Sequence, residues 1–474
     1  MLKSKNNTVL VIYLIALCLI GPLIFWLSYR GGTVSPQIAQ RSPSASNLFS
    51  PYKTQAIRRR ISSGNKVLIT ADNNPDKQAA TQAFAAGEYD KAVNKFTTSL
   101  QINRNDPEAW IYLNNAAVAS KRDTIKIGVS IPIGGNLNVA REILRGVAQA
   151  QHEVNHSGGI QGKLIQIQIA NDDNDPAISK QIAAEFVQDS NILAVIGHNS
   201  SDASIAAAPI YQQGGIVMIS PTSVARSLAR MGRYIFRTTP STRAIADVLA
   251  AYVVTSARKT KIAICTDSQA EASRSFAEEF TLSVFEYGGR VTNTACDFSA
   301  PSFNPSNIPS QAISDGADAL LLAPAVNKID QAIDVAKANK GRLPLISSHT
   351  MYTFQTLQQG QVNTNGMVLP VTWHPTAFPQ SPFIAKAKKF WGGAGSWRTA
   401  MSYDATMAVS NGLKSGTTRQ DLQRALSNSG FLFDGATGVV RFLPSGDRQG
   451  SGILVRIQPG RISGTNYDFV MFRP

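Results

Sequence analysis

The sequence has few of the residues and motifs that build metal and cofactor sites. Its three cysteines lie far apart, at positions 18, 265 and 296, and the chain has only five histidines. We therefore expect no metal site of the cysteine–histidine kind. Neither a G-x-G-x-x-G turn nor a phosphate-loop lysine motif follows the first predicted strand, and no serine sits in a G-x-S-x-G elbow. We expect a protein that is not an enzyme and that uses no cofactor.

Positive charge is concentrated in the first quarter of the chain. The net charge is +15, but residues 1–123 hold 15 lysines and arginines against 7 acidic residues, and the remainder holds 31 against 24. No dense basic stripe with interleaved aromatic residues occurs, so a nucleic-acid partner is not expected. The run Arg58–Arg60, with Lys53 and Lys66 nearby, suits either a solvated surface or contact with an anionic membrane.

The cysteine spacing does not define a disulfide. Cys18 lies in an apolar N-terminal segment, whereas Cys265 and Cys296 each end or follow a predicted strand. Spacing alone does not decide between a disulfide and free thiols. We expect two buried thiols.

The N-terminus carries an almost unbroken apolar stretch from Val9 to Leu27, which Gly21-Pro22 interrupts. Its 19 residues suit a membrane span and exceed the apolar region of a typical signal peptide. We expect residues 1–30 to be an uncleaved membrane anchor, with a cleaved signal as the alternative. In either case the rest of the chain would be exported.

Residues 31–74 are rich in Ser, Pro, Gln and Asn, which is typical of a linker. Ile57, Ile61 and the run at 67–70 are apolar enough for part of this linker to dock and become ordered.

Residues 75–121 have a helical pattern. Asp106-Pro107-Glu108 is a typical helix start. The spacing Gly87-x-Tyr89-x-x-Ala92-x-x-x-Phe96 resembles a tetratricopeptide repeat, of which residues 76–119 would form a partial copy. Such repeats bury their faces only against neighbours. The segment is therefore either a module that binds a protein partner or a helical spacer.

Strands and helices alternate from Thr124 onward. The predicted strands lie at 125–131, 165–170, 192–198 and, further on, near 261, 291, 319, 344 and 366, and the first helices at 139–155 and 176–188. Regular alternation without an antiparallel run predicts a doubly wound α/β fold. About 350 residues exceed a single core, so we expect two α/β lobes.

Two polar turns follow neighbouring strands between residues 192 and 224. The first is Asn199-Ser200-Ser201 and the second is Pro221-Thr222-Ser223, each ahead of a predicted helix. Parallel strands place both turns at one edge of a sheet. Free backbone N–H groups there, with the hydroxyls of Ser201 and Thr222, could bind an anion. The alternative is that both hydroxyls only cap their helices.

A series of short motifs runs through residues 124–474. They are IKIGV followed by Gly134-Gly135 and Arg145-Gly146, Asn155-x-x-Gly158-Gly159-Ile160-x-Gly162, Asp172-Asp173-x-Asp175-Pro176, IGHNSS, ISPTS, Phe236-Arg237-Thr238-Thr239-Pro240, Tyr403-Asp404-Ala405 and Phe442-x-x-x-Gly446-Asp447. In this order they resemble the type I periplasmic substrate-binding proteins of branched-chain amino-acid ABC transporters, the Leu/Ile/Val-binding-like family. The layout with an N-terminal anchor and repeat resembles membrane-tethered cyanobacterial relatives.

The resemblance implies a periplasmic binding protein-like I fold, with two lobes that close on a ligand through a hinge. Lobe one would comprise residues 124–242 and 372–448. Lobe two would comprise residues 243–371 and 449–474.

The resemblance also implies where a ligand carboxylate would bind. Ser201 and the turn at Thr222 match the family's carboxylate-binding positions, and Ser204 is a possible extra donor. A further hydroxyl of the family falls on Val224 here, so that donor is absent or is supplied by Ser223.

The other half of the family's site departs from the pattern. The family holds an α-ammonium with two tyrosines and an acid, and these positions carry Glu271, Ala325 and His349 here. No aromatic residue remains at them for a cation–π contact. Glu271 would either pair with an ammonium or be solvated at a helix start, and His349 would be either a ligand contact or an ordinary loop histidine.

We therefore expect an exported substrate-binding protein, tethered on the periplasmic side of the inner membrane. It would capture a small polar metabolite, such as an amino acid or a related carboxylate or amide, and deliver it to an ABC transporter permease. The alternative is a ligand sensor or protein-interaction scaffold on the same fold, not coupled to transport. Catalysis is not expected, because neighbouring residues in IGHNSS at a strand end point apart.

Overall fold

The computed structural model describes residues 51–121 and 123–474. The expected anchor at 1–30 and the first part of the expected linker lie outside these residues. Among the helices of the described part, none is long and apolar enough to cross a membrane.

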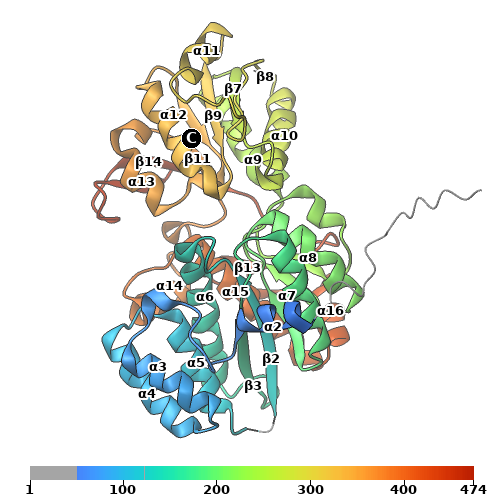
Figure 1. Ribbon diagram of the computed structural model, residues 1–474. Helices are drawn as coiled ribbons and strands as arrows, with labels where there is room; N and C mark the ends of the chain where they lie inside the picture. Colours follow the sequence, from blue (N-terminus) through green and yellow to red (C-terminus); the bar gives the residue numbers. More distant parts are fainter. Residues whose placement is uncertain (1–50, 122) are drawn as a thin grey trace, which may run out of the picture. The chain divides into compact units, whose positions relative to one another are not determined.

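The first sheet contains six strands in the order β1-β3-β2-β4-β5-β6 (Figure 1). Their bounds are β1 Ile61–Ser62, β2 Thr124–Ile131, β3 Leu164–Asn171, β4 Ile192–Ile196, β5 Val217–Ser220 and β6 Ile235–Arg237. The connecting helices are α6 Leu137–His156, α7 Pro176–Gln188 and α8 Ser201–Gln213. All strand pairs are parallel except β1, which pairs antiparallel with β3.

The second sheet contains seven strands in the order β15-β14-β11-β10-β9-β7-β8. Their bounds are β7 Lys261–Thr266, β8 Arg290–Val291, β9 Ala319–Ala323, β10 Leu345–Ser347, β11 Val368–Val371, β14 Ile453–Pro459 and β15 Tyr467–Met471. The helices between these strands are α9 Thr242–Ala251, α10 Glu271–Glu286, α11 Ile308–Ser314, α12 Ile329–Asn339 and α13 Phe354–Gly360. The strands β14 and β15 are antiparallel, so the expectation of no antiparallel run was wrong and both sheets are mixed.

Helices cover both faces of each sheet, as a doubly wound fold requires. In β9, Leu320 and Leu322 pack in the cluster that contains α11 and α12, whereas Ala319, Leu321 and Ala323 pack in the cluster that contains α9 and α10. This alternation follows from the period of two residues along a strand. It explains why β9 is an unbroken apolar run with every residue buried.

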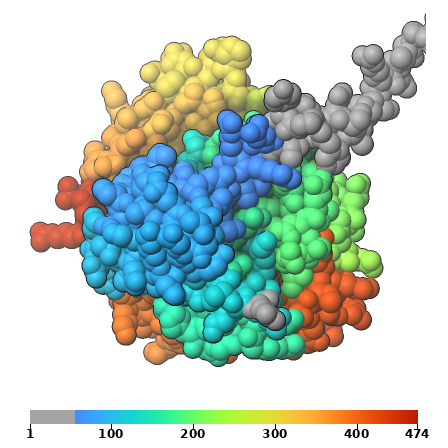
Figure 2. All heavy atoms as spheres, turned by 60° about the horizontal axis from the view of Figure 1, so that its bottom comes forward, coloured from blue at the N-terminus to red at the C-terminus, as the bar shows by residue number. Residues whose placement is uncertain are grey.

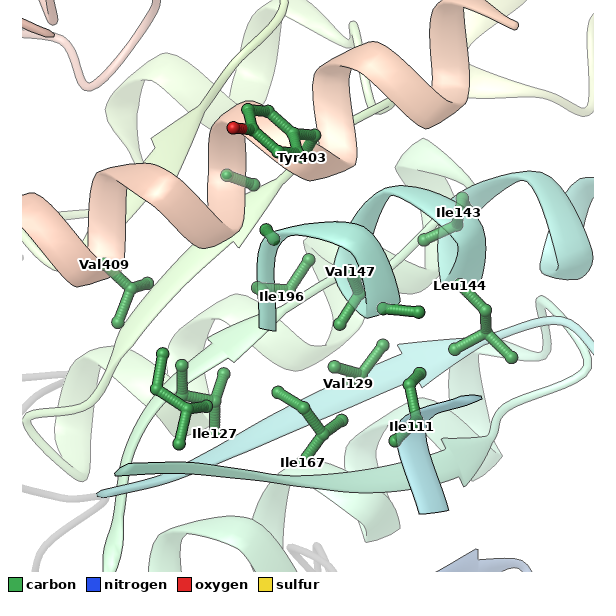
Figure 3. Close-up of a cluster of buried hydrophobic side chains, with 14 of the residues drawn as sticks. Ile111, Ile127, Val129, Ile143, Leu144, Val147, Ile167, Ile196, Tyr403 and Val409 are labelled. Atoms are coloured by element: carbon green, nitrogen blue, oxygen red, sulfur yellow. The ribbon is translucent and has the colours of Figure 1, made fainter. Parts of the chain in front are cut away.

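The chain returns to the first sheet after β11. The returning elements are α14 Pro382–Trp391, α15 Trp397–Gly412, α16 Arg419–Leu426 and the hairpin β12 Phe433–Gly435 with β13 Gly438–Val440. Helix α15 packs closely on α6, because a Cβ on Gly146 would lie 2.1 Å from the carbonyl oxygen of Thr399. In Figure 3, Val409 of α15 and Val147 of α6 lie above Ile127 and Ile167 of the strands, and Tyr403 of α15 lies farther from the sheet. Each such buried side chain contributes roughly 1.5–3 kcal/mol of burial free energy.

The described part of the expected linker, residues 51–74, is ordered, in keeping with the expectation that its apolar residues dock. It forms α2 Pro51–Arg59 and β1, and Ile57 is buried against α7. Next come the helices α3 Pro75–Ala85, α4 Tyr89–Ile102 and α5 Pro107–Val118. Helix α5 contacts α6 and β3, and Figure 3 shows Ile111 pointing into the core beside Ile167. In Figure 2 these blue residues lie against the teal residues that follow them.

A buried ionic network fixes this N-terminal part. The ammonium of Lys77 lies 2.6 Å from Asp106 and 2.8 Å from Glu108, and all three side chains are fully buried or nearly so. Glu108 also accepts the backbone N–H of Leu68 at 2.7 Å and the hydroxyl of Tyr112 at 3.0 Å. Asp106 caps α5 and Pro107 follows it, so the predicted helix start is confirmed. The assignment to a tetratricopeptide repeat stays a prediction.

Cys265 and Cys296 form a disulfide, so the expectation of two thiols was wrong. The segment after β8 runs beside the end of β7, where Thr266 pairs with Asp297. This pairing brings the two Cα atoms within 4.6 Å. A distance of this size suits a disulfide, and the 31-residue separation in sequence does not reveal it.

Candidate functional site

A cavity of about 610 Å³ lies at the carboxyl ends of strands from both sheets. It is lined by the turns after β2, β3, β4 and β5 of the first sheet, by the turns after β7, β9 and β10 of the second sheet, and by the start of α15. In α/β folds the carboxyl ends of parallel strands are the usual place for a ligand. The volume is that of a small-molecule site.

Ser201 lies on the wall of this cavity in the first turn of α8. Its Oγ accepts the backbone N–H groups of Val224 at 3.2 Å and Ala225 at 3.1 Å. Ser200, not Ser201, caps the helix by accepting the N–H of Ala203. Because Ser201 accepts in both of its hydrogen bonds within the described chain, its hydroxyl proton remains to be donated to a ligand.

Thr222 also lines the cavity, but its hydroxyl donates to the carbonyl oxygen of Asn199 at 2.9 Å. Ser204 and Ser223 do not line the cavity. Their Oγ atoms lie 2.7 Å apart, and both hydroxyls also reach the carbonyl oxygen of His198. The structure therefore brings Ser201 and Thr222 to the cavity and places Ser204 and Ser223 behind its wall.

The helix expected after Thr222 is only the 3₁₀ helix η3 Arg226–Arg230, without a side-chain cap. The guanidinium of Arg237 donates to the carbonyl oxygen of Ala225 at 2.7 Å, and the hydroxyl of Thr242 donates to that of Val224. These side-chain hydrogen bonds occupy carbonyl oxygens that would accept backbone N–H groups in a longer helix. The turn at Thr222 therefore does not lead into the helix N-terminus that was predicted to bind an anion, and Thr222 caps no helix.

A buried network holds the turn after β4. The Nδ1 atom of His198 lies 2.7 Å from Asp172, and its Nε2 atom lies 3.2 Å from the hydroxyl of Tyr211. The carbonyl oxygen of His198 accepts the hydroxyl of Ser220 at 2.8 Å. All of these side chains are buried. The network joins β3, β4, α8 and β5, and so fixes the backbone that presents Ser201.

Glu271 does not line the cavity, although its neighbours Ala270 and Ala272 do. Its carboxylate lies 2.6 Å from the guanidinium of Arg274 and also accepts the hydroxyl of Ser275 at 3.4 Å. An ammonium of a ligand would have to displace these partners. Asp202, whose pKa is raised by burial, does line the cavity and accepts the N–H of Glu271 at 3.4 Å.

His349 lies on the cavity wall in the 3₁₀ helix η6 His349–Met351, after β10. Burial, followed by repulsion from Arg398, lowers the pKa of His349 to about 4. The imidazole is therefore neutral at neutral pH. Its ring meets the indole of Trp397 edge to face, with 6.1 Å between the centroids.

An aromatic side chain does face the cavity, although no aromatic residue remains at the family's positions. Trp397 begins α15 and lines the cavity together with Arg398. The guanidinium carbon of Arg398 lies 4.5 Å from the centre of the Trp397 ring, and its Nη1 donates to Glu142 at 3.0 Å. The sequence pattern gave no signal for these two residues.

Two further carboxylates reach the cavity. Asp267 accepts the backbone N–H of Gln269 at 3.0 Å and the hydroxyl of Ser299. Asp173 forms an ion pair with Arg60 at 2.6 Å. The site thus combines hydroxyl, indole, guanidinium and carboxylate groups, which suits a small polar molecule.

We compared the sequence with models of known protein families. A family model described as "Periplasmic binding protein" matches residues 124–460. The chain belongs to this family. Its members are binding proteins and not enzymes, which agrees with the expectation that the chain is not an enzyme.

The chain is similar to binding proteins for amino acids. It is 31% identical over 170 residues to Leu/Ile/Val-binding protein homolog 1 of Brucella abortus, a match that covers 35% of this chain and 45% of the relative. It is 28% identical over 184 residues to an amino acid binding protein of Pseudomonas aeruginosa, covering 37% and 49%. The match therefore spans less than half the length of these relatives.

Solved structures share the fold. A leucine binding protein from Thermotoga maritima has a TM-score of 0.66 at 19% identity, over 73% of this chain and 98% of that one. A solute binding protein from Rhodopseudomonas palustris, in complex with 3,4-dihydroxybenzoic acid, has a TM-score of 0.62 at 18% identity, over 74% and 97%. At these identities the likeness is one of fold.

The sequence also contains His152-Glu153-x-x-His156, the spacing of a zinc-protease helix, near the end of α6. This motif does not line the cavity. Glu153 accepts the hydroxyl of Tyr403 at 2.9 Å and pairs with Lys386 at 2.8 Å. Across the described residues, no three His, Cys, Asp or Glu side chains are grouped to hold a metal ion. The motif is therefore a packing feature here.

Proposed function

We propose that this chain is an exported substrate-binding protein that captures a small polar metabolite and delivers it to an ABC transporter permease. The observation that carries the proposal is Ser201 on the cavity wall: its oxygen accepts two backbone N–H groups, and among the described residues its hydroxyl donates to none. A hydroxyl fixed in this way is oriented before the ligand arrives, which lowers the entropic cost of binding. Amino acids and related carboxylates or amides are the substrate class.

The proposed ligand cycle uses closure of two lobes, 124–242 with 372–448 and 243–371 with 449–474. Residues of both lobes line the cavity, so a bound ligand would make contacts that exist only when the lobes approach each other. Such differential contacts are what allow a ligand to shift a conformational equilibrium. The closed form would be the state that the permease recognises.

The proposal includes attachment to the periplasmic side of the inner membrane through residues 1–30. The family description supports a periplasmic receptor. The apolar stretch of 19 residues supports the tether. The helices α3–α5 would then be the first folded part after the tether, and residues 76–119 could also meet a protein partner.

The test is a thermal-shift screen of residues 51–474 against amino acids, short carboxylates, amides and aromatic acids. A ligand at a hundred times its dissociation constant should stabilise the protein by roughly 2.7 kcal/mol. Stabilisation by none of these compounds would contradict the proposal and would favour the sensor or scaffold function.

The variant Ser201→Ala tests the carboxylate site. We expect it to weaken a carboxylate ligand by roughly 1–3 kcal/mol, because a charge-assisted hydrogen bond is lost. Ser204→Ala is the matched control, since it removes a buried hydroxyl close to the same turn but outside the cavity lining. Titration calorimetry that gives equal affinity for wild type and Ser201→Ala would remove Ser201 from the site.

A further inference from the structure

One corner of the cavity contains two polar side chains with no partner. The indole Nε1 of Trp397 and the Nδ1 of His349 are buried and lack a hydrogen-bond partner within the described residues. The two side chains are 4% and 7% exposed, and both line the cavity. Buried polar groups are almost always satisfied, so an unsatisfied pair on a cavity wall points to a group that the cavity receives.

The same corner is rich in donors. An indole nitrogen only donates, a neutral imidazole donates from one nitrogen, and a guanidinium carries five N–H donors. Arg398 lines the cavity beside Trp397, and its Nη1 donates to Glu142, which does not line the cavity. A molecule in the cavity therefore meets the cation of this pair and not the anion.

The carboxylates that line the cavity, unlike these donors, already have hydrogen-bond or ion-pair partners. Asp267 already accepts two hydrogen bonds, Asp202 accepts the N–H of Glu271, and Asp173 is paired with Arg60. The unpartnered groups are thus the indole N–H of Trp397, which only donates, and the neutral imidazole of His349, which can donate from one of its two nitrogens. An ammonium placed at this corner would meet N–H groups and a positive charge.

We propose that the corner formed by His349, Trp397 and Arg398 binds a hydrogen-bond-accepting group of the ligand. This inference rests on the proposed function and specifies its substrate class. The cavity then takes carboxylates that carry a second acceptor group, such as 2-oxo acids or hydroxylated aromatic acids, in preference to zwitterionic amino acids. His349 comes from the second sheet and Trp397 from a helix on the first, so an acceptor bound between them would link the two lobes.

The experiment is titration calorimetry of the full-length chain in detergent with three probes. Leucine and 4-methyl-2-oxopentanoate share one carbon skeleton, but the oxo acid has a planar carbonyl where leucine has an α-hydrogen and an ammonium, and 4-hydroxybenzoate tests an aromatic acid. We expect the oxo acid or 4-hydroxybenzoate to bind at least about tenfold more tightly than leucine. The variant Trp397→Phe keeps the ring but removes the N–H, and should weaken the better ligand by about tenfold.

Trp391→Phe is the matched control. Trp391 is 7% exposed and its Nε1 is also buried without a partner, but it does not line the cavity. Its substitution should leave every affinity unchanged, and unfolding curves of each variant without ligand verify that both are folded.

The outcomes separate the two proposals. Leucine binding that equals or exceeds that of the other probes, with Trp397→Phe equal to wild type, would overturn the inference and leave the binding function intact. Equal losses in Trp397→Phe and Trp391→Phe would also overturn it, because the effect would then not be local to the cavity. Binding of none of the probes, or of any compound in the wider screen, would overturn the proposed function and this inference with it.

Discussion

The buried imidazole of His349 makes the stability of the protein depend on pH in a predictable direction. Burial, with the nearby charge of Arg398, lowers the pKa of His349 from its usual 6.5 to about 4. Between these values the unfolded chain binds a proton that the folded chain does not, so acidification favours unfolding. The stability is complete above pH 6.5 and is lost as the pH falls toward 4. At about 1.36 kcal/mol for each pKa unit, the full effect is roughly 3 kcal/mol.

The perturbation is His349→Gln, which removes the titrating group and keeps a polar side chain of similar length. Urea denaturation at pH 7 and pH 4.5 gives the free energy of unfolding for each protein. Between these two pH values wild type should lose about 2 kcal/mol more than the variant.

Other buried groups titrate in the same range with the opposite sign. Burial raises the pKa of Asp404 and that of Asp106 to about 6, so both acids favour the folded state as the pH falls from 6 toward 4. They are present in wild type and variant alike, and therefore cancel in the difference. Equal pH dependence in wild type and His349→Gln would refute the argument that His349 is buried as a neutral ring.

Two further changes test what holds the chain together. Lys77→Met should lower the free energy of unfolding at neutral pH by about 3–5 kcal/mol, because it leaves buried Asp106 and Glu108 without their counter-charge. Lys91→Met, at an exposed ion pair, should cost less than about 1 kcal/mol, and equal losses in urea denaturation would contradict the role of the buried network. Replacing both Cys265 and Cys296 by serine should cost about 3–4 kcal/mol for a loop of this length, and an unchanged denaturation midpoint would show that the disulfide contributes no stability.

The local elements of the fold could be predicted because their sequence patterns are local. The run at 125–131 lies within β2, and Asp106-Pro107-Glu108 starts α5. The first is a short apolar run that predicts a strand, and the second is a helix cap followed by proline. Both patterns depend only on residues that are neighbours in the sequence. For residues 51–74 the sequence indicates docking through apolar residues such as Ile57 and Ile69, which are buried, but it does not predict the helix α2 or the strand β1.

The non-local pairings could not be predicted from the same patterns. The strands β14 and β15 form an antiparallel pair that adds to β11, the last strand of the parallel part of the second sheet, a choice that depends on which side of that part is open. The disulfide depends on the segment after β8 running beside β7. Neither relation leaves a mark in the composition or periodicity of the residues involved.

The residues on the two sides of the cavity differ in how well the sequence predicts their position. Ser201 and Thr222 could be placed together from sequence, because each follows a parallel strand and the register of β4 with β5 brings their ends to one edge. Trp397 and Arg398 begin a helix that returns to the first sheet after the second sheet has been built, so no strand register links them to Ser201. When a residue comes to a site because the chain passes back from the second sheet to the first, only the three-dimensional structure shows that its side chain lines the cavity. The specificity that we propose for this cavity therefore rests mainly on the residues that the sequence pattern identifies least well.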